Sequence, residues 1–167
     1  MTLAIRTGAV DVHYPEAGGA RAALVVGDLP GFTVTVERVV WLDSAEPYEP
    51  GSFYKRELPA VRAVLEGVEP VRMLIVDGYV DLDPDGRPGL GAHVHAALGI
   101  PVIGVAKTSF RTATHAAVVL RGGATKPLFV TAAGLPVPEA ARYVTGMSGA
   151  YRMPDALRRV DALARGR

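Results

Sequence analysis

The chain has 167 residues, of which 49% are hydrophobic and 21% are charged, and its formal net charge is +1. This length and apolar content suffice for a hydrophobic core, so we expect one domain over residues 1–167. The absence of cysteine excludes disulfides, thiolate metal sites and a cysteine nucleophile. The small net charge argues against non-specific coating of nucleic acid, yet it leaves room for a local basic groove.

No apolar run in the sequence has the length of a membrane span. The longest runs have strand length, at residues 22–26, 73–76 and 100–106. The first ten residues lack a basic region followed by a long apolar core, so we predict no signal peptide. These features predict a cytoplasmic protein with no membrane partner.

The first half of the chain is rich in strand patterns. Residues 3–14 predict a strand that ends near Asp11, and residues 20–28 and 32–42 predict an antiparallel pair across a Leu-Pro-Gly turn. Residues 44–52 predict a loop. Apolar residues at helical spacing then predict a helix over residues 53–68, and a continuous apolar run predicts a buried strand over residues 71–77.

The second half alternates between helices and strands. We predict helices over residues 89–99, 136–147 and 153–166, and strands over residues 100–106, 115–122 and 126–132. Three antiparallel strands followed by parallel β/α units predict an α/β fold, a mixed sheet with helices on both faces. Such sheets bind ligands at the carboxyl ends of their parallel strands, where Asp77 and Lys107 are expected.

Three acidic residues have positions that this order restricts. Asp11 lies late in the first strand, Glu57 lies at the start of the first helix, and Asp77 ends the strand after it. If the first and fourth strands are neighbours, the two aspartates converge and the helix brings Glu57 toward them. Three carboxylates from separate elements would suit Mg²⁺ or Mn²⁺, which can stabilise charge on a phosphodiester.

Each acid also has a structural explanation. An Asp-Gly pair at a strand end is often a turn, so Asp77 alone is equally compatible with either role. Glu57 alone is better explained by the helix dipole. Asp11 is harder to explain in this way, because it interrupts an apolar strand, where an unpaired charge is costly to bury.

Five motifs resemble the endonuclease V family, in the order in which that family carries them. They are VDVHY, PYEPGSFYKRELPAV, LIVDG, LGAHVHAALGIPVIGVAKTSF and YRMPDALRRVD, and they cover almost the whole chain. The resemblance implies a ribonuclease H-like fold. It also implies a divalent-metal endonuclease that cuts inosine-containing DNA or RNA, at the second phosphodiester on the 3′ side of the lesion.

The resemblance assigns roles to individual residues. It makes Asp11, Glu57 and Asp77 the metal-binding carboxylates, with Mg²⁺ or Mn²⁺ as cofactor, and it places Lys107 near the scissile phosphate. Tyr48 matches the wedge aromatic that fills the space of a flipped base, and Gly51 ends the same loop. Gly78 falls beside the lesion pocket. Arg56 contacts a phosphate or holds Glu57, and the sequence does not choose between the two.

The sequence departs from the family pattern in two places near the site. Where the family has Asp-Gly-x-Gly-x-x-His, this chain has Val80 and Asp83 in place of the second glycine and the histidine. A valine cannot take the positive φ angles that glycine permits, so we expect a different loop shape. A Gly-His pair that follows the strand at residues 128–131 in the family is also absent; Gly134 or Leu135 stands at the place.

Two functions remain open at this point. The first is a compact, monomeric metal-dependent nuclease acting in DNA repair on inosine-containing nucleic acid. The second is a relative that keeps the metal site but has lost inosine cleavage, and binds a nucleotide or metal or acts on another phosphate-containing substrate. The intact acidic trio favours the first, and the missing histidines favour the second.

Overall fold

The computed structural model describes residues 3–45, 47, 49–50 and 54–167. Its strands are β1 (Ile5–His13), β2 (Ala20–Leu29), β3 (Val36–Leu42), β4 (Met73–Asp77), β5 (Val102–Ala106), β6 (Ala117–Val119) and β7 (Leu128–Ala133). Its helices are α1 (Tyr54–Leu65), α2 (Leu90–Leu98), α3 (Val137–Gly146) and α4 (Asp155–Ala164). Within the described residues, no helix combines the length and the apolar character needed to cross a bilayer.

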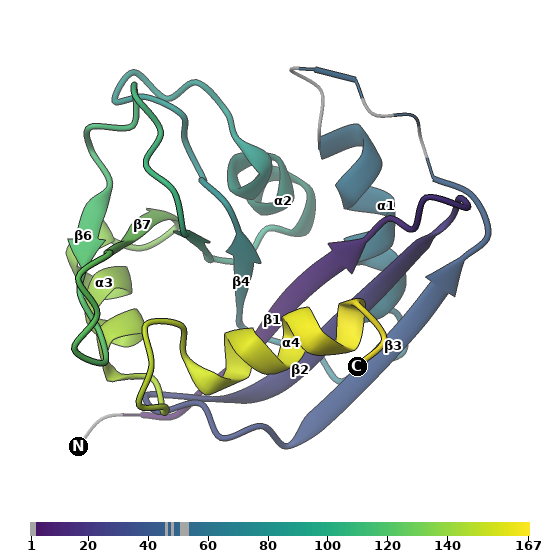
Figure 1. Ribbon diagram of the computed structural model, residues 1–167, viewed down its shortest axis with the longest axis horizontal. Helices are drawn as coiled ribbons and strands as arrows, with labels where there is room; N and C mark the ends of the chain where they lie inside the picture. The colour runs from purple at the N-terminus through teal and green to yellow at the C-terminus, as the bar shows by residue number, and fades with distance from the viewer. Residues whose placement is uncertain (1–2, 46, 48, 51–53) are drawn as a thin grey trace.

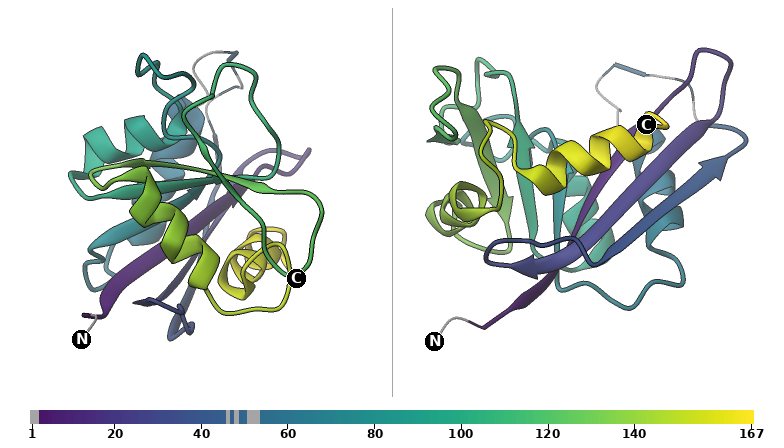
Figure 2. Two further views of the ribbon diagram at one scale, coloured as in Figure 1. Left: turned by 90° about the vertical axis from the view of Figure 1, so that its left-hand side faces the viewer. Right: turned by 60° about the horizontal axis from the view of Figure 1, so that its bottom comes forward.

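All the strands belong to one mixed sheet with the order β3-β2-β1-β4-β5-β7-β6. The central strands β1, β4 and β5 run parallel to one another, and the outer pairs are antiparallel. Helices α1 and α2 cover one face, and α3 and α4 cover the other; α4 crosses β1 and β2 in Figure 1, and Figure 2 shows both layers. The expected α/β sheet with helices on both faces is confirmed.

The two faces of the sheet bury two separate cores. Successive strand residues point to opposite faces, so in β4 Ile75 packs with α3 and α4, while Leu74 and Val76 pack with α1 and α2. This double burial explains the continuous apolar run in β4. Helix α2 ends at Gly99, whose φ of 70° is the left-handed conformation that suits glycine.

Several strand boundaries differ from the prediction; β6, for example, covers only Ala117–Val119 of the expected residues 115–122. Strand β1 continues past Asp11 to His13, because β2 pairs with it along its whole length and places Arg21 opposite His13. Strand β3 starts at Val36 and not at residue 32, because Phe32 has a positive φ of 63° in a tight turn. Asp11 is therefore a residue within a paired strand and not the residue that ends it.

Candidate active site

The register of two parallel strands brings Asp11 and Asp77 together. Strand β1 pairs with β4 so that Ala9 lies opposite Ile75. Asp11 and Asp77 each lie two residues further along their strands, so they lie side by side at the same level of the sheet. Ala9 and Ile75 belong to the core under α3 and α4, so by strand alternation the two aspartates point to the face that α4 covers.

Glu57 reaches the same place from the opposite layer. It lies in the first turn of α1, and only 7% of its surface is exposed. Beside it, the Arg56 guanidinium lies over the ring of Tyr14, 3.6 Å from the ring centroid. The Tyr14 hydroxyl and the Arg56 Nε are both buried without a hydrogen bond of good geometry to the described residues. A hydroxyl and a guanidinium thus border the buried carboxylate of Glu57.

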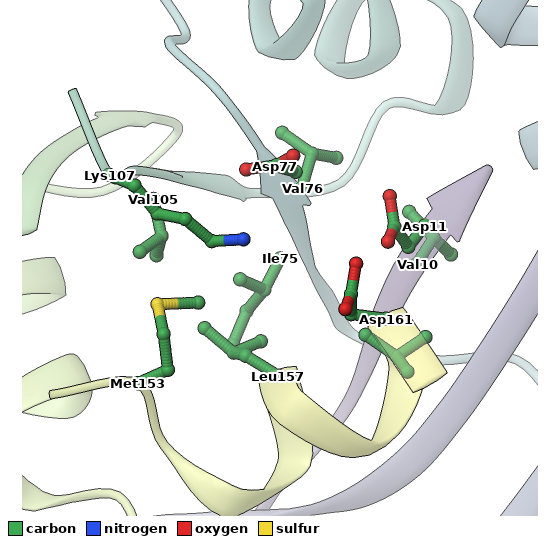
Figure 3. Close-up of a pocket in the computed structure, with 11 residues that line it drawn as sticks. Val10, Asp11, Ile75, Val76, Asp77, Val105, Lys107, Met153, Leu157 and Asp161 are labelled. Atoms are coloured by element: carbon green, nitrogen blue, oxygen red, sulfur yellow. The ribbon is translucent and has the colours of Figure 1, made fainter. Parts of the chain in front are cut away.

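Two cavities meet at the aspartates. One, of about 160 Å³, is lined by Asp11, Tyr14, Glu57 and Asp77 among others. The second is narrower, about 30 Å³, and lies under α4; Figure 3 shows Asp11, Asp77, Lys107 and Asp161 around it. Because Asp11 and Asp77 line both, the two cavities are adjacent, and carboxylates from β1, β4 and α1 lie around them at the carboxyl ends of the parallel strands.

Asp161 is a fourth acid that we did not predict from the sequence. It lies on α4 and faces Asp11 at the narrower cavity (Figure 3), close enough for each carboxyl group to affect the pKa of the other. Arg165, one turn further along α4, donates from Nε to Asp161 Oδ1 at 3.0 Å. The available signal was the family motif YRMPDALRRVD, whose last residue is Asp161.

Burial and mutual repulsion raise the pKa values of most of these carboxyl groups. Partial burial, with the charges of Asp77 and Asp161, raises the pKa of Asp11 to about 7. Burial raises the pKa of Glu57 to about 7 as well, against a lowering effect of the Tyr14 hydroxyl. For Asp161 burial acts in the same direction, but Arg165 outweighs it and holds the pKa below its usual value. The two neighbouring acids are therefore shifted in opposite directions, with the pKa of Asp11 raised and that of Asp161 lowered.

Asp77 and Lys107 form the mixed-charge wall of the site. The Asp77 residue is open to solvent at the rim, but the protein packed around its carboxyl group raises its pKa. Lys107 partly offsets that rise, because its ammonium extends into the narrower cavity toward the aspartates (Figure 3). Lys107 is the first residue after β5 and lies two positions beyond Val105, which is opposite Asp77 in the sheet.

The donors in this site suit a hard divalent cation. Carboxylate oxygens are the ligands that Mg²⁺ and Mn²⁺ prefer, and a cation would favour the charged form of carboxyl groups whose pKa values burial and, to a smaller extent, repulsion raise. As the side chains stand, no three Asp, Glu or His residues in the described part of the chain are close enough to hold one ion jointly. Asp11 Oδ1 accepts the N–H of Val12 at 3.0 Å.

The loop after β4 is anchored to the sheet by its first residues. The N–H of Gly78 donates to the Val105 carbonyl at 2.9 Å, and the N–H of Val80 donates to Thr131 Oγ1 at 2.8 Å. A side chain at Gly104 would collide with the Gly78 carbonyl, 2.5 Å from its Cβ position, so the close approach requires glycine there. Val80 is fully buried in the core under α1 and α2.

Asp83, which stands where the family has histidine, is a turn residue. Its Oδ1 accepts the backbone N–H groups of Asp85 and Arg87 at 3.0 and 3.1 Å. Asp81 forms an isolated bridge with Pro88 in the same turn. Neither residue lines the two cavities at the carboxylates.

The predicted substrate-binding residues are only partly within the described chain. Arg56 and Gly78 lie beside the carboxylates, on α1 and at the end of β4. Tyr48 and Gly51 lie outside the described residues, so their assignments rest on the sequence alone.

Comparison with known proteins identifies the family. Residues 4–162 match the family model of Endonuclease V. The chain is 34% identical to Endonuclease V of Streptomyces coelicolor, over 96% of this chain and 78% of that protein. It is 36% identical to Endonuclease V of Thermococcus kodakarensis, over 95% of this chain and 77% of that protein.

Solved structures agree with this. The crystal structure of Endonuclease V from Streptomyces avermitilis matches with a TM-score of 0.81 at 28% identity, covering 96% of this chain and 80% of that one. Ciona intestinalis Endonuclease V, in complex with a 23mer DNA containing an inosine followed by a ribo-adenosine, shares the fold with a TM-score of 0.84 at 19% identity, covering 98% of this chain and 85% of that one. The ribonuclease H-like fold is confirmed, and the chain belongs to the Endonuclease V family of nucleases.

Proposed function

We propose that this protein is a divalent-metal-dependent endonuclease that hydrolyses a phosphodiester on the 3′ side of inosine in nucleic acid. The observation that carries the proposal is the convergence of Asp11, Glu57 and Asp77 from three separate elements, next to Lys107. Such a cluster is costly for a fold, since buried like charges repel. Acids arranged in this way at the ends of parallel strands are typical of functional sites.

In this proposal Asp11, Glu57 and Asp77 hold Mg²⁺ or Mn²⁺, and Asp161 borders the same space. When bound, the cation supplies a water of lowered pKa and counter-charge for the phosphodiester. The chain's own groups do the rest. Burial of Glu57 restricts its side chain, and Lys107 offers an ammonium on the opposite wall for a non-bridging phosphate oxygen.

Arg56, Gly78, Tyr48 and Gly51 are the proposed contacts to the substrate. The face of the Arg56 guanidinium is occupied by Tyr14, but its Nε has no hydrogen-bond partner among the described residues. Binding a phosphate would satisfy that buried donor, which is the reason to prefer this role over simply holding Glu57. Tyr48 keeps its predicted role as the wedge and Gly51 its place in the same loop, on the resemblance alone.

Inosine is the proposed lesion because a structural relative of this chain binds DNA that contains it. The Ciona intestinalis enzyme has been crystallised with inosine-containing DNA. The proposed partner is therefore inosine-containing DNA or RNA. We also propose that residues 1–167 act as one domain, since every described strand belongs to one sheet, and that the protein works as a monomer in the cytoplasm.

One observation favours a second function. The loop after β4 carries buried Val80 and the turn residue Asp83 where the family has glycine and histidine. A protein with this loop would keep the metal site but lose inosine recognition, and act on a different phosphate-containing substrate or bind a nucleotide. The carboxylate cluster is common to both functions, so substrate choice is what separates them.

Cleavage of defined oligonucleotides tests the proposal. Labelled DNA and RNA strands with one inosine, and matched strands with guanine, are incubated with Mg²⁺, with Mn²⁺ or with a chelator. We expect cleavage 3′ to the inosine only with metal, and none by Asp77→Ala. Metal-dependent cutting that ignores inosine would support the second function, and no cutting of any inosine strand would contradict the first.

A further inference from the structure

Two arginines outside the carboxylate cluster hold the wall of the site that carries Lys107. We call Arg121 and Arg152, with the carbonyl groups that they bind, the arginine clamp. Arg121 follows β6 and is 6% exposed. Its guanidinium donates to backbone carbonyls of the segment between α3 and α4, those of Met147 at 2.6 Å, Tyr151 at 3.1 Å, Gly149 at 3.2 Å and Arg152 at 3.3 Å. That segment is therefore held at four residues between positions 147 and 152.

Arg152 extends the clamp from this segment to the active-site edge of the sheet. Its Nη2 donates to the carbonyl of Lys107, directly after β5, and to the carbonyl of Pro127 at 2.7 Å, directly before β7. A planar guanidinium that bridges two carbonyls restrains both of them in distance and in direction. The backbone of Lys107 is thus tied to a segment 45 residues further along the chain.

The clamp connects the two opposite walls of the narrower cavity. Lys107 lies on one wall, and its ammonium points into the cavity (Figure 3). Met153, next to Arg152 in sequence, lines the same cavity, and α4 then carries Asp161 on the other wall. One arginine therefore sets how the backbone of Lys107 sits relative to the helix of Asp161.

We propose that Arg152 is a positioning residue for catalysis, acting through the backbone of Lys107, with Arg121 holding Arg152 in place. The proposal rests on the proposed function, in which Lys107 binds the phosphodiester. Lys107 is otherwise exposed and has a long flexible side chain, so a fixed backbone is what directs its ammonium to one place. Misplacement of a catalytic group by about 1 Å can cost roughly 100-fold in rate.

A purely structural clamp would give different results, and a double-mutant cycle separates the two. Arg152→Met keeps the length of the side chain and removes both hydrogen bonds. We expect it to lower kcat at least about tenfold with KM changed less than about twofold, because the interaction acts on the transition state. In the Lys107→Ala background the same change should cost nothing further.

Controls distinguish positioning from loss of stability. Arg152→Lys retains one donor for the carbonyls and should recover part of the lost kcat. Arg142→Met, on the exposed side of α3, should leave kcat unchanged. An equal loss of kcat from Arg152→Met with and without Lys107 would overturn the proposal, because Arg152 would then act independently of Lys107.

Nuclear magnetic resonance tests the same contact without any activity. In Arg152→Met we expect the carbonyl ¹³C signal of Lys107 to shift and its side-chain ¹³Cε signal to move toward that of a freely rotating lysine. Arg142→Met should leave both signals in place. Unchanged Lys107 signals in Arg152→Met would overturn the inference even if the wild type cleaves inosine strands. Shifted signals in a protein without cleavage would refute the proposed function and leave the clamp standing.

Discussion

The carboxylate cluster and the arginine clamp both contain charged side chains that are wholly or partly buried. They differ in the groups that surround those charges. Arg121 is buried with carbonyl oxygens on its guanidinium. Glu57 is buried to a similar degree, and its pKa is raised first by burial and then by the charges of Asp11 and Asp77, against the lowering effects of Tyr14 and Arg56. The Arg121 guanidinium is therefore paired with carbonyl groups of the protein, whereas Glu57 lies among other carboxyl groups.

This difference indicates what each region contributes. A buried charge whose hydrogen bonds are all made within the fold rigidifies the structure around it. A buried charge among like charges costs stability and persists where function requires it. We therefore propose that the arginine clamp maintains the structure around the site and that the carboxylate cluster carries out the reaction. Each prediction below tests that division.

The largest expected effect is on catalysis at the cluster. Asp77→Asn removes one of the proposed metal ligands, and we expect kcat on an inosine strand to fall about 1,000-fold or more. Asp85→Asn is the matched control, because Asp85 is an exposed turn residue in the loop that follows. Cleavage assays under metal saturation measure both. A variant Asp77→Asn that cuts within tenfold of wild type would remove this residue from the mechanism.

The next effect is on stability at the clamp. Arg121→Met leaves buried carbonyls without donors, so we expect the free energy of unfolding to fall by about 3 kcal/mol. Urea denaturation measures this, with Arg142→Met as a control that should change it by less than about 0.5 kcal/mol. If Arg121→Met is as stable as the control, the clamp does not hold the α3–α4 segment.

A smaller effect is the pH dependence of the metal-free protein. The pKa values of Asp11 and Glu57 are raised to about 7 in the folded state, so folding binds protons. Stability from these groups is fully present below their unfolded pKa values and is lost as the pH rises through about 7. In chelator we expect the free energy of unfolding to fall from pH 5 to pH 8 by roughly 2 to 3 kcal/mol for each of the two groups.

Replacing one acid should flatten that dependence. Glu57→Gln cannot ionise, so its free energy of unfolding should change less between pH 5 and pH 8 than that of wild type, and it should be the more stable protein at pH 8. Urea denaturation at the two pH values measures this. A wild type that becomes more stable with rising pH would contradict the raised pKa values.

The sequence was sufficient for much of the fold because the patterns were local. Continuous apolar runs located β4 and β5, and Gly99 marked the end of α2. The predicted end of β1 was wrong because the true end depends on pairing with β2, a contact between residues that are separated in the sequence. The start of β3 was misplaced because the positive φ of Phe32, unusual for a non-glycine residue, leaves no mark in composition.

The site was predictable where the position of a residue along its strand matters. Asp11 and Asp77 converge because β1 and β4 are parallel neighbours, which the sequence analysis could state only as a condition and the structure fulfils. Asp161 was missed because a helix with Leu157 and Val160 facing inward gives no sign of which strands it covers. The clamp was invisible for a similar reason, since Arg121 and Arg152 bind backbone carbonyls, which any sequence possesses.

The central claim, that the cluster binds a divalent cation, is tested most directly by titrating Mn²⁺ into the metal-free protein in a calorimeter. Wild type and Asp11→Ala are compared at the same pH, with a melting curve for each to show that both are folded. We predict a saturable heat for wild type and a loss of at least about tenfold in affinity for Asp11→Ala. Identical Mn²⁺ binding by the two proteins, or none by the wild type, would contradict the account.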